Sequence, residues 1–181
     1  MHALNDVRAL SKPALYDELE SSLRALIAGE PNLIACAANM SALLYWSLPD
    51  LSWVGFYLLD DASGDLIVGP FQGKPACVRI PLSKGVCGAA ASQRRTLVVA
   101  DVHAFPGHIA CDSASNSELV VPIVLADGRL LGVLDLDSPL LSTKRGEQID
   151  DGVWEVMLAN PEDLPTETAR ELRELEDILQ L

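Results

Sequence analysis

Residues 118–138 read ELVVPIVLADGRLLGVLDLDS, and this segment gives the clearest indication of secondary structure in the chain. Two apolar runs of strand length, residues 119–125 and 130–136, lie on either side of Asp127-Gly128. Asp-Gly between two such runs is typical of a tight turn in a β-hairpin. The segment therefore predicts two adjacent antiparallel strands.

The residues before this hairpin predict further short strands and three helices. Pro13 can occupy the first turn of a helix that residues 29–31 (GEP) end, and Asn32 can cap a second helix that runs to about Leu48. The other expected elements are strands at residues 53–59, 66–68, 78–80 and 96–100 and a short helix at residues 86–93. Helices flanking a mostly antiparallel sheet define an α+β fold class.

The chain has 181 residues, which suits one domain or one domain with an appended helix. Pro70, Gly73 and Pro75 predict a loop between two strands, and residues 101–117 predict a long loop before the hairpin. Residues 165–181 have the pattern of an acidic amphipathic helix. With no internal repeat and no interdomain linker, residues 1–181 are predicted to form a single domain.

The chain carries 13 basic and 26 acidic residues, a net charge of -13. Nucleic acids are bound mainly by cationic side chains that neutralise phosphates, so this composition argues against a nucleic-acid partner. The N-terminal residues lack the cationic and apolar regions of a signal peptide. No apolar stretch approaches the roughly 20 residues that cross a bilayer. We therefore expect a cytoplasmic protein without membrane contact.

Cys77, Cys87 and Cys111 lie in loop-like segments bounded by Gly, Pro and Asp. Cytosolic thiols are kept reduced, so cysteines outside the core are more often catalytic, redox-active or metal-binding than structural. Cys36 falls inside the second expected helix and is interpreted as a small core residue.

These three cysteines allow three interpretations. They can be buried spectators. They can bind a metal together with His103 or His108, although the close C-x2-4-C pairs of structural zinc sites are absent from the sequence. They can also catalyse thiol redox chemistry, in which one cysteine attacks the substrate and another resolves the product.

Asp135 and Asp137 stand two residues apart in the last expected strand, and therefore on the same face. Either this face is solvated, with Asp137 at the strand end, or the two acids form a functional pair. When a thiolate attacks a sulfoxide sulfur, an acid must protonate the departing oxygen. A carboxyl group buried beside others has a raised pKa and can hold that proton. The neighbourhood of Glu118 and Cys111 favours the functional interpretation.

Five segments resemble those of the free methionine-(R)-sulfoxide reductases, a family built on a GAF domain: SWVGFYLL, GPFQGKPACVRIP, GVCGAAA, DVHAFPGHIACDSASNSELVVP and GVLDLDS. The resemblance covers about residues 28–138, with residues 139–181 as a helical C-terminal extension. It implies a GAF-like antiparallel sheet that carries helices on one side. It also implies a thioredoxin-dependent enzyme of oxidative stress defence that reduces free L-methionine-(R)-sulfoxide without a metal or organic cofactor.

The resemblance assigns roles to the cysteines. Cys111 matches the catalytic nucleophile, and Cys77 matches the cysteine that closes a disulfide with it after methionine leaves. Cys87 matches the third cysteine of the family, an auxiliary or alternative resolving thiol. The resemblance also implies substrate-binding residues: Glu118, Asp135, Asp137, Trp53 and Tyr57. For the two aromatic residues, simple packing in a strand is the alternative.

A second class of function is a non-catalytic GAF-type sensor of a small ligand, and a third is a redox switch whose disulfide is the signal. Repeated turnover would distinguish an enzyme from both. The divergent segment after Ser138 either covers the sheet or joins a homodimer.

Overall fold

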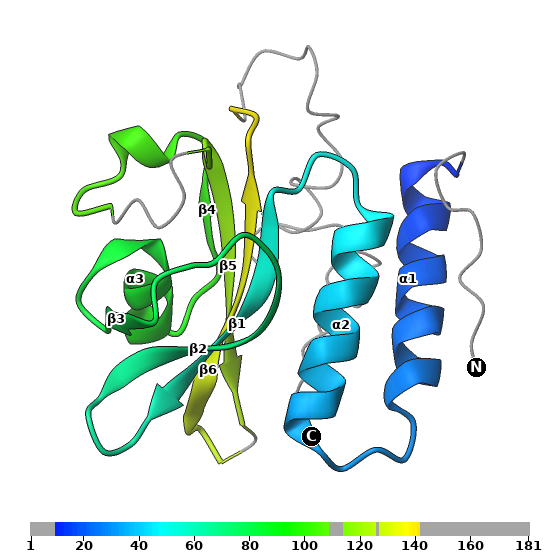
Figure 1. The fold of residues 1–181 in the computed structure, drawn as a ribbon, viewed down its shortest axis with the longest axis horizontal. Coiled ribbons are helices and arrows are strands. Elements are labelled where there is room, and N and C mark those ends of the chain that lie inside the picture. The colour runs from blue at the N-terminus through cyan, green and yellow to red at the C-terminus, as the bar shows by residue number, and fades with distance from the viewer. Residues whose placement is uncertain (1–9, 109–113, 126, 142–181) are drawn as a thin grey trace.

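The computed structural model describes residues 10–108, 114–125 and 127–141. These residues form a six-stranded antiparallel sheet with the strand order β3-β2-β1-β6-β5-β4 (Figure 1). The strands are β1 (Trp53–Asp60), β2 (Asp65–Gly73), β3 (Arg79–Pro81), β4 (Leu97–Val99), β5 (Ser117–Val124) and β6 (Leu130–Ser138). The helices are α1 (Lys12–Ile27), α2 (Leu33–Ser47), α3 (Gly85–Gln93) and the short 3-10 helix η1 (Val102–Ala104). The fold is α+β, as the sequence predicts.

The first two helices form where the sequence predicts them. Helix α1 has proline in its first turn and buries a row of leucines spaced by four residues. Gly29 takes a positive φ of 74°, which lets the chain reverse between the helices. The Asn32 side chain then accepts a hydrogen bond of 3.0 Å from the Ala35 N–H at the start of α2.

Strand β2 is longer than the sequence predicts, because it includes Pro70 and Gly73, which we expected in a loop. Its pairing with β1 shifts register between Gly55 and Tyr57. Such an irregularity interrupts the ladder of backbone hydrogen bonds, so a proline that lacks an N–H can be accommodated in the strand. The loop prediction was wrong for these two residues.

Strands β5 and β6 form the hairpin that residues 118–138 predict. Residues 125–129 connect them, with Gly128 at a φ of 84° and a hydrogen bond of 2.8 Å from the Leu125 N–H to the Arg129 carbonyl. The pairing runs from Ser117 opposite Ser138 to Val124 opposite Leu130. This register sets which side chains of the two strands meet on each face of the sheet.

Alternate residues of the central strands contribute to two separate hydrophobic cores. Val54 and Phe56 of β1 pack with α1 and α2, whereas Trp53 and Tyr57 of the same strand pack with α3. Figure 1 shows α1 and α2 on one side of the sheet and α3 on the other. The expectation of helices on one side is therefore corrected. Helix α3 is built largely of small and apolar residues, and it buries them against the second face.

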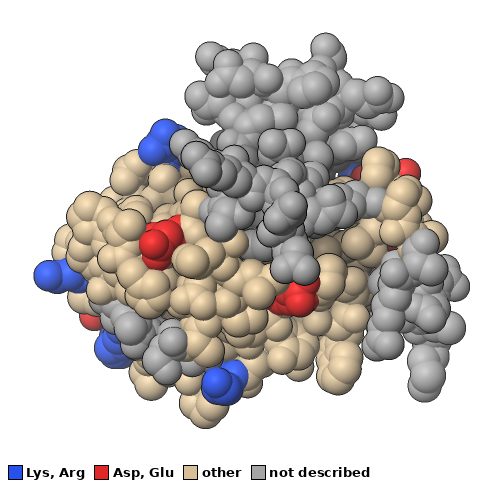
Figure 2. Space-filling view, turned by 90° about the horizontal axis from the view of Figure 1, so that it is seen from above, with Lys and Arg blue, Asp and Glu red and all other residues tan. Residues whose placement is uncertain are grey.

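The described helices are all too short or too polar to cross a membrane. On the face in Figure 2, the Lys and Arg side chains of the described residues are scattered rather than gathered into a patch. The helix predicted at residues 165–181 lies outside the described residues.

Candidate active site

A pocket lies on the α3 face of the sheet. Its empty space of about 510 Å³ includes open solvent, so the pocket is a partly open hollow and not an enclosed cavity. Its lining residues are Trp53, Tyr57, Pro75, Ala76, Ile80, Gly85, Val86, Cys87, His108, Ser115, Glu118, Asp135 and Asp137. The pocket thus brings together Cys87 and all five residues that the sequence predicts to bind substrate.

Three carboxyl groups form one wall of this pocket. Glu118 comes from β5, and Asp135 and Asp137 come from β6, where their spacing of two residues puts both on the pocket face. Glu118 is 7% exposed and Asp135 is 5% exposed, so these two do not lie on a solvated face. Asp137 is half-buried and stands opposite Glu118 in the sheet. The prediction that the two aspartates share a face is confirmed.

Burial changes the proton affinity of this wall. Desolvation, followed by the charge of Asp137, raises the pKa of Glu118 from 4.5 to about 8, while a hydrogen bond from Cys87 opposes the shift. Desolvation, followed by the charges of Asp137 and Glu118, also raises the pKa of Asp135 well above its ordinary value. At neutral pH the wall therefore retains protons that exposed carboxyl groups would have lost.

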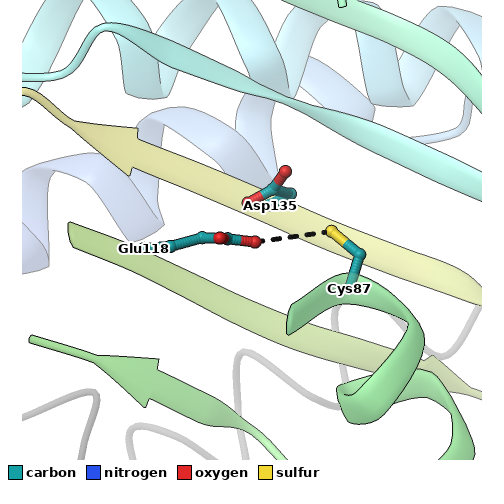
Figure 3. A group of neighbouring side chains, drawn as sticks. All are labelled: Cys87, Glu118 and Asp135. Carbon is teal, nitrogen blue, oxygen red and sulfur yellow. Dashed lines mark hydrogen bonds between the residues drawn. The ribbon is translucent and has the colours of Figure 1, made fainter. Parts of the chain in front are cut away.

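Cys87 lies in the first turn of α3 and points at the carboxyl wall (Figure 3). Its thiol donates a hydrogen bond of 3.7 Å to the Oε1 of Glu118. Burial, followed by the charges of Asp135 and Glu118, raises the pKa of this thiol. Cys87 is therefore a neutral thiol, and it lies inside the short helix that the sequence predicts at residues 86–93.

The position of Cys87 depends on a close approach of α3 to the end of β3. A Cβ atom at Gly88 would lie 2.5 Å from the Pro81 carbonyl oxygen, so only glycine fits there.

The Sγ of Cys87 and a carboxylate oxygen from each of Glu118 and Asp135 lie within 4.8 Å of one another. A cation bound by these three groups would have to displace the protons that their raised pKa values retain.

Aromatic rings form a second wall. Trp53 stacks on Tyr57 with ring centroids 5.6 Å apart and on Phe71 at 5.3 Å. The Trp53 indole N–H donates to the Lys74 carbonyl at 3.1 Å, which fixes the ring. Trp53 and Tyr57 thus pack in the core and line the pocket at once.

The cysteines differ in state. Cys36 and Cys87 carry free thiols, and both are buried. Cys36 lies inside α2, as its interpretation as a core residue requires. Cys77 is disulfide-bonded and sits beside Ala76, which lines the pocket. Cys111 lies outside the described residues.

Two polar residues of the pocket were missed as site residues by the sequence interpretation. Ser115 was not singled out, and His108 was considered only as a possible metal ligand beside the cysteines. His103 does not line the pocket; its ring packs edge-on against that of His108 with centroids 6.4 Å apart, and its Nε2 donates to the Asn116 Oδ1 at 3.0 Å. The sequence signal that could have found Ser115 and His108 is their position three or four residues from Cys111.

Comparison with known proteins agrees with this architecture. A family model described as GAF domain matches residues 41–156. The free methionine-R-sulfoxide reductase of Escherichia coli is 52% identical over 129 residues, which cover 71% of this chain and 76% of that protein. The free methionine-R-sulfoxide reductase of Saccharomyces cerevisiae is 46% identical over 133 residues, covering 71% and 74%. The X-ray structure of the Neisseria meningitidis free methionine-R-sulfoxide reductase, in complex with its substrate, superposes with a TM-score of 0.79 at 43% identity, covering 99% and 94%.

The fold and the family match together define a GAF-domain protein. Within that class, the identities to characterised relatives are decisive. The chain belongs to the free methionine-R-sulfoxide reductase family, which confirms the resemblance seen in the sequence.

Proposed function

We propose that this protein reduces free L-methionine-(R)-sulfoxide to L-methionine by cysteine chemistry. Membership of the reductase family supports this assignment, and the observation that carries it is a carboxyl wall with raised pKa values inside an aromatic-lined pocket. A thiolate can displace a sulfoxide oxygen only if that oxygen is protonated as it leaves. The wall of Glu118 and Asp135 holds protons at neutral pH and can supply one.

The reaction begins with the thiolate of Cys111. It attacks the sulfoxide sulfur, the sulfoxide oxygen is transferred to the cysteine as a sulfenic acid, and the two-electron reduction releases methionine. The acid cluster supplies a proton to that oxygen while the S–O bond of the substrate breaks. The same acid cluster, Glu118, Asp135 and Asp137, also attracts the ammonium group of the free amino acid. A methionine sulfoxide inside a peptide has no such ammonium group.

The sulfenic acid is resolved by Cys77. Its thiol condenses with the sulfenic acid of Cys111, which forms a disulfide and releases water. Two observations support this pairing: Cys77 is disulfide-bonded, and Cys36 and Cys87, two of the other three cysteines, carry free thiols. Thioredoxin then reduces the disulfide by thiol–disulfide exchange.

Cys87 serves as an auxiliary thiol in this scheme. It is 3% exposed, and its pKa is raised by burial and by the neighbouring carboxyl groups, so little of it is the reactive thiolate. These properties favour Cys77 as the resolving cysteine and give Cys87 the task of donating a hydrogen bond to Glu118.

The compartment, the reductant and the oligomeric state complete the proposal. We infer a cytoplasmic enzyme that uses thioredoxin and can assemble as a homodimer through its C-terminal extension. The test is consumption of NADPH by the purified protein with thioredoxin and thioredoxin reductase. Turnover of the free R sulfoxide, but not of the S epimer or of a blocked peptide analogue, is the expected result. A protein with reduced thiols that turns over none of them would instead be a ligand sensor or a redox switch.

A further inference from the structure

We propose that Cys87, Glu118 and Asp135 form a binding site for a divalent cation of the Zn²⁺ class, and that a cation bound there inhibits the reductase. The cation is an inhibitor and takes no part in the reduction of methionine sulfoxide. The site follows from the geometry of three side chains, whereas the inhibition rests on the proposed function.

The three side chains come from different elements and meet on the α3 face of the sheet: Cys87 from α3, Glu118 from β5 and Asp135 from β6 (Figure 3). The Cys87 Sγ and one carboxylate oxygen from each acid lie within 4.8 Å of one another. The donors of a tetrahedral zinc site lie roughly 3.5 Å apart, because each is about 2.0–2.3 Å from the metal. The Cys87 Sγ lies 3.7 Å from the Glu118 Oε1, so small side-chain adjustments complete a three-donor site.

Two buried polar atoms at this place have no hydrogen-bond partner in the described structure. Asp135 is 5% exposed, and its Oδ1 is one of these atoms. Ser115, which lines the same pocket and is 4% exposed, contributes the other through its Oγ. A buried polar atom without a partner is unfavourable, and a ligand that supplies the partner removes the penalty. A cation can bind the Asp135 carboxylate, and a water on the cation can bind the Ser115 hydroxyl.

The pocket gives the site access and a further ligand. Cys87, Glu118 and Asp135 all line it, and its empty space includes open solvent. Three protein ligands with water in the fourth position make up an open zinc site. A hydrated cation can thus reach the three donors from the pocket and keep one water.

The donor set selects the kind of cation. Mg²⁺ and Ca²⁺ prefer sites built of oxygen ligands, whereas a thiolate favours Zn²⁺ and similar metals. The Cys87 thiol, which donates a hydrogen bond to Glu118, must lose its proton to bind a metal, and a thiophilic cation displaces that proton best. Two carboxylates and one thiolate carry three negative charges, and a divalent cation offsets two of them.

A cation in this position opposes the proposed reaction in two ways. It replaces the proton that the acid cluster supplies to the sulfoxide oxygen, so the S–O bond cannot break as proposed. It also offsets the negative charge that attracts the substrate ammonium, and two cations at one place repel each other. Binding of the cation and reduction of the substrate therefore exclude each other.

The first test is a titration with Co²⁺, a probe that occupies tetrahedral sites and shows a thiolate charge-transfer band in the near ultraviolet. The disulfide-bonded protein is used, because Cys77 is then engaged and Cys36 and Cys87 carry free thiols. The band should saturate at about one Co²⁺ per chain. Zn²⁺ should abolish the band by displacing Co²⁺, and a large excess of Mg²⁺ should leave it unchanged.

Substitutions locate the bound Co²⁺. Cys87→Ser should abolish the band, and Cys36→Ser should keep it, because Cys36 lies inside α2. Glu118→Gln and Asp135→Asn should each weaken Co²⁺ binding by at least about tenfold. Asp65→Asn is the matched control, since it changes a carboxylate that forms an ion pair outside the pocket lining. Circular dichroism and thermal unfolding establish that each variant is folded.

The second test measures inhibition in the reduced protein without thioredoxin. The initial rate of methionine release from the free R sulfoxide is followed at increasing Zn²⁺, and each protein is compared with its own rate in the absence of Zn²⁺. The Zn²⁺ concentration that halves the rate should be at least about tenfold higher in Cys87→Ser than in the wild type. Both proteins keep Cys77 and Cys111, so zinc bound to those thiols alone would inhibit them equally.

The outcomes separate the metal site from the proposed function. Absence of the Co²⁺ band in the wild type, an undiminished band in Cys87→Ser, or displacement by Mg²⁺ as effective as by Zn²⁺ would overturn the site. Equal inhibition of the wild type and Cys87→Ser by Zn²⁺ would overturn the inhibitory role. Absence of methionine release by the wild type without Zn²⁺ would overturn the proposed function, while the Co²⁺ titration would still decide the site.

Discussion

Glu118 of β5 stands directly opposite Asp137 of β6, and both side chains line the same pocket. Burial disfavours the ionised form of a carboxyl group, and the charge of a second carboxylate in the adjacent strand adds to this penalty. The pair is relieved when one group holds a proton, and the pKa of Glu118 is accordingly raised to about 8. Keeping this acid buried and protonated beside the substrate therefore lowers the stability of the folded protein.

The first prediction concerns the pH dependence of stability. The pKa of Glu118 rises from 4.5 to about 8 on folding, so the folded protein binds more protons than the unfolded chain between these values. Its contribution is therefore complete below about pH 4.5 and is lost as the pH rises through 8, by roughly 2–5 kcal/mol in the free energy of unfolding. Urea unfolding from pH 5 to pH 9 measures this loss.

Glu118→Gln tests the origin of that slope. The amide cannot ionise, so the variant should lose less stability than the wild type between pH 5 and pH 9. Glu20→Gln is the control, because Glu20 lies on α1 far along the chain and pairs with Arg24 at the surface. An unchanged slope in Glu118→Gln would show that Glu118 does not titrate in this range.

The second prediction concerns Cys87. Its thiol donates to Glu118 and so favours the ionised carboxylate. Cys87→Ala removes this donor and should raise the pKa of the acid, which moves the alkaline limb of the kcat profile to higher pH. Cys87→Ser keeps a donor and should leave the limb nearly in place. Thioredoxin-dependent turnover that stops after one methionine in Cys87→Ser would instead identify Cys87 as the resolving cysteine.

The third prediction concerns Cys77. We expect Cys77→Ser to form methionine once and then to stall or slow sharply with thioredoxin, because its sulfenic acid has no resolving thiol. The time course of methionine release, measured by chromatography, reports this directly. Cys36→Ser is the matched control: Cys36 is buried in α2 on the other side of the sheet and should not be needed for recycling. Sustained wild-type turnover in Cys77→Ser would refute the assignment.

The fourth prediction concerns the packing of α3. In Gly88→Ala the new Cβ would lie 2.5 Å from the Pro81 carbonyl oxygen and 3.0 Å from backbone atoms of Leu82, so the helix must move. We expect a loss of about 1–3 kcal/mol in the free energy of unfolding. Ala89→Ser, at the half-buried next position, should change it by less than about 1 kcal/mol. Equal effects of the two substitutions in chemical unfolding would contradict a tight contact at Gly88.

Local sequence patterns predicted much of this fold because they record local physics. The alternation of Leu134, Asp135, Leu136 and Asp137 required one face with two acids, and the structure has it. Asn32 was likewise predicted to cap the second helix, and its side chain accepts a hydrogen bond from the Ala35 N–H. The irregular pairing of β1 with β2 was missed. Proline and glycine occur both in bulged strands and in loops, so Pro70 and Gly73 could not distinguish the two structures.

The site was predicted in part, and what was missed depends on packing between distant segments. The resemblance to a family supplied Glu118, Trp53 and Tyr57 as pocket residues. The contact of Cys87 with Glu118 joins residues 31 positions apart and exists only because α3 packs on the second face of the sheet. No periodicity in the sequence records which face a helix will cover. For the same reason His108 and Ser115 looked like ordinary loop residues.

The central claim is that Cys111 reduces free methionine-(R)-sulfoxide, and the most direct test is the methionine released without any external reductant. The fully reduced wild-type protein, mixed with an excess of the free R sulfoxide, should release about one methionine per chain, because one pair of thiols is oxidised. Cys111→Ser should release none, although Cys77 and Cys87 are both present. A full equivalent of methionine from Cys111→Ser would contradict the account.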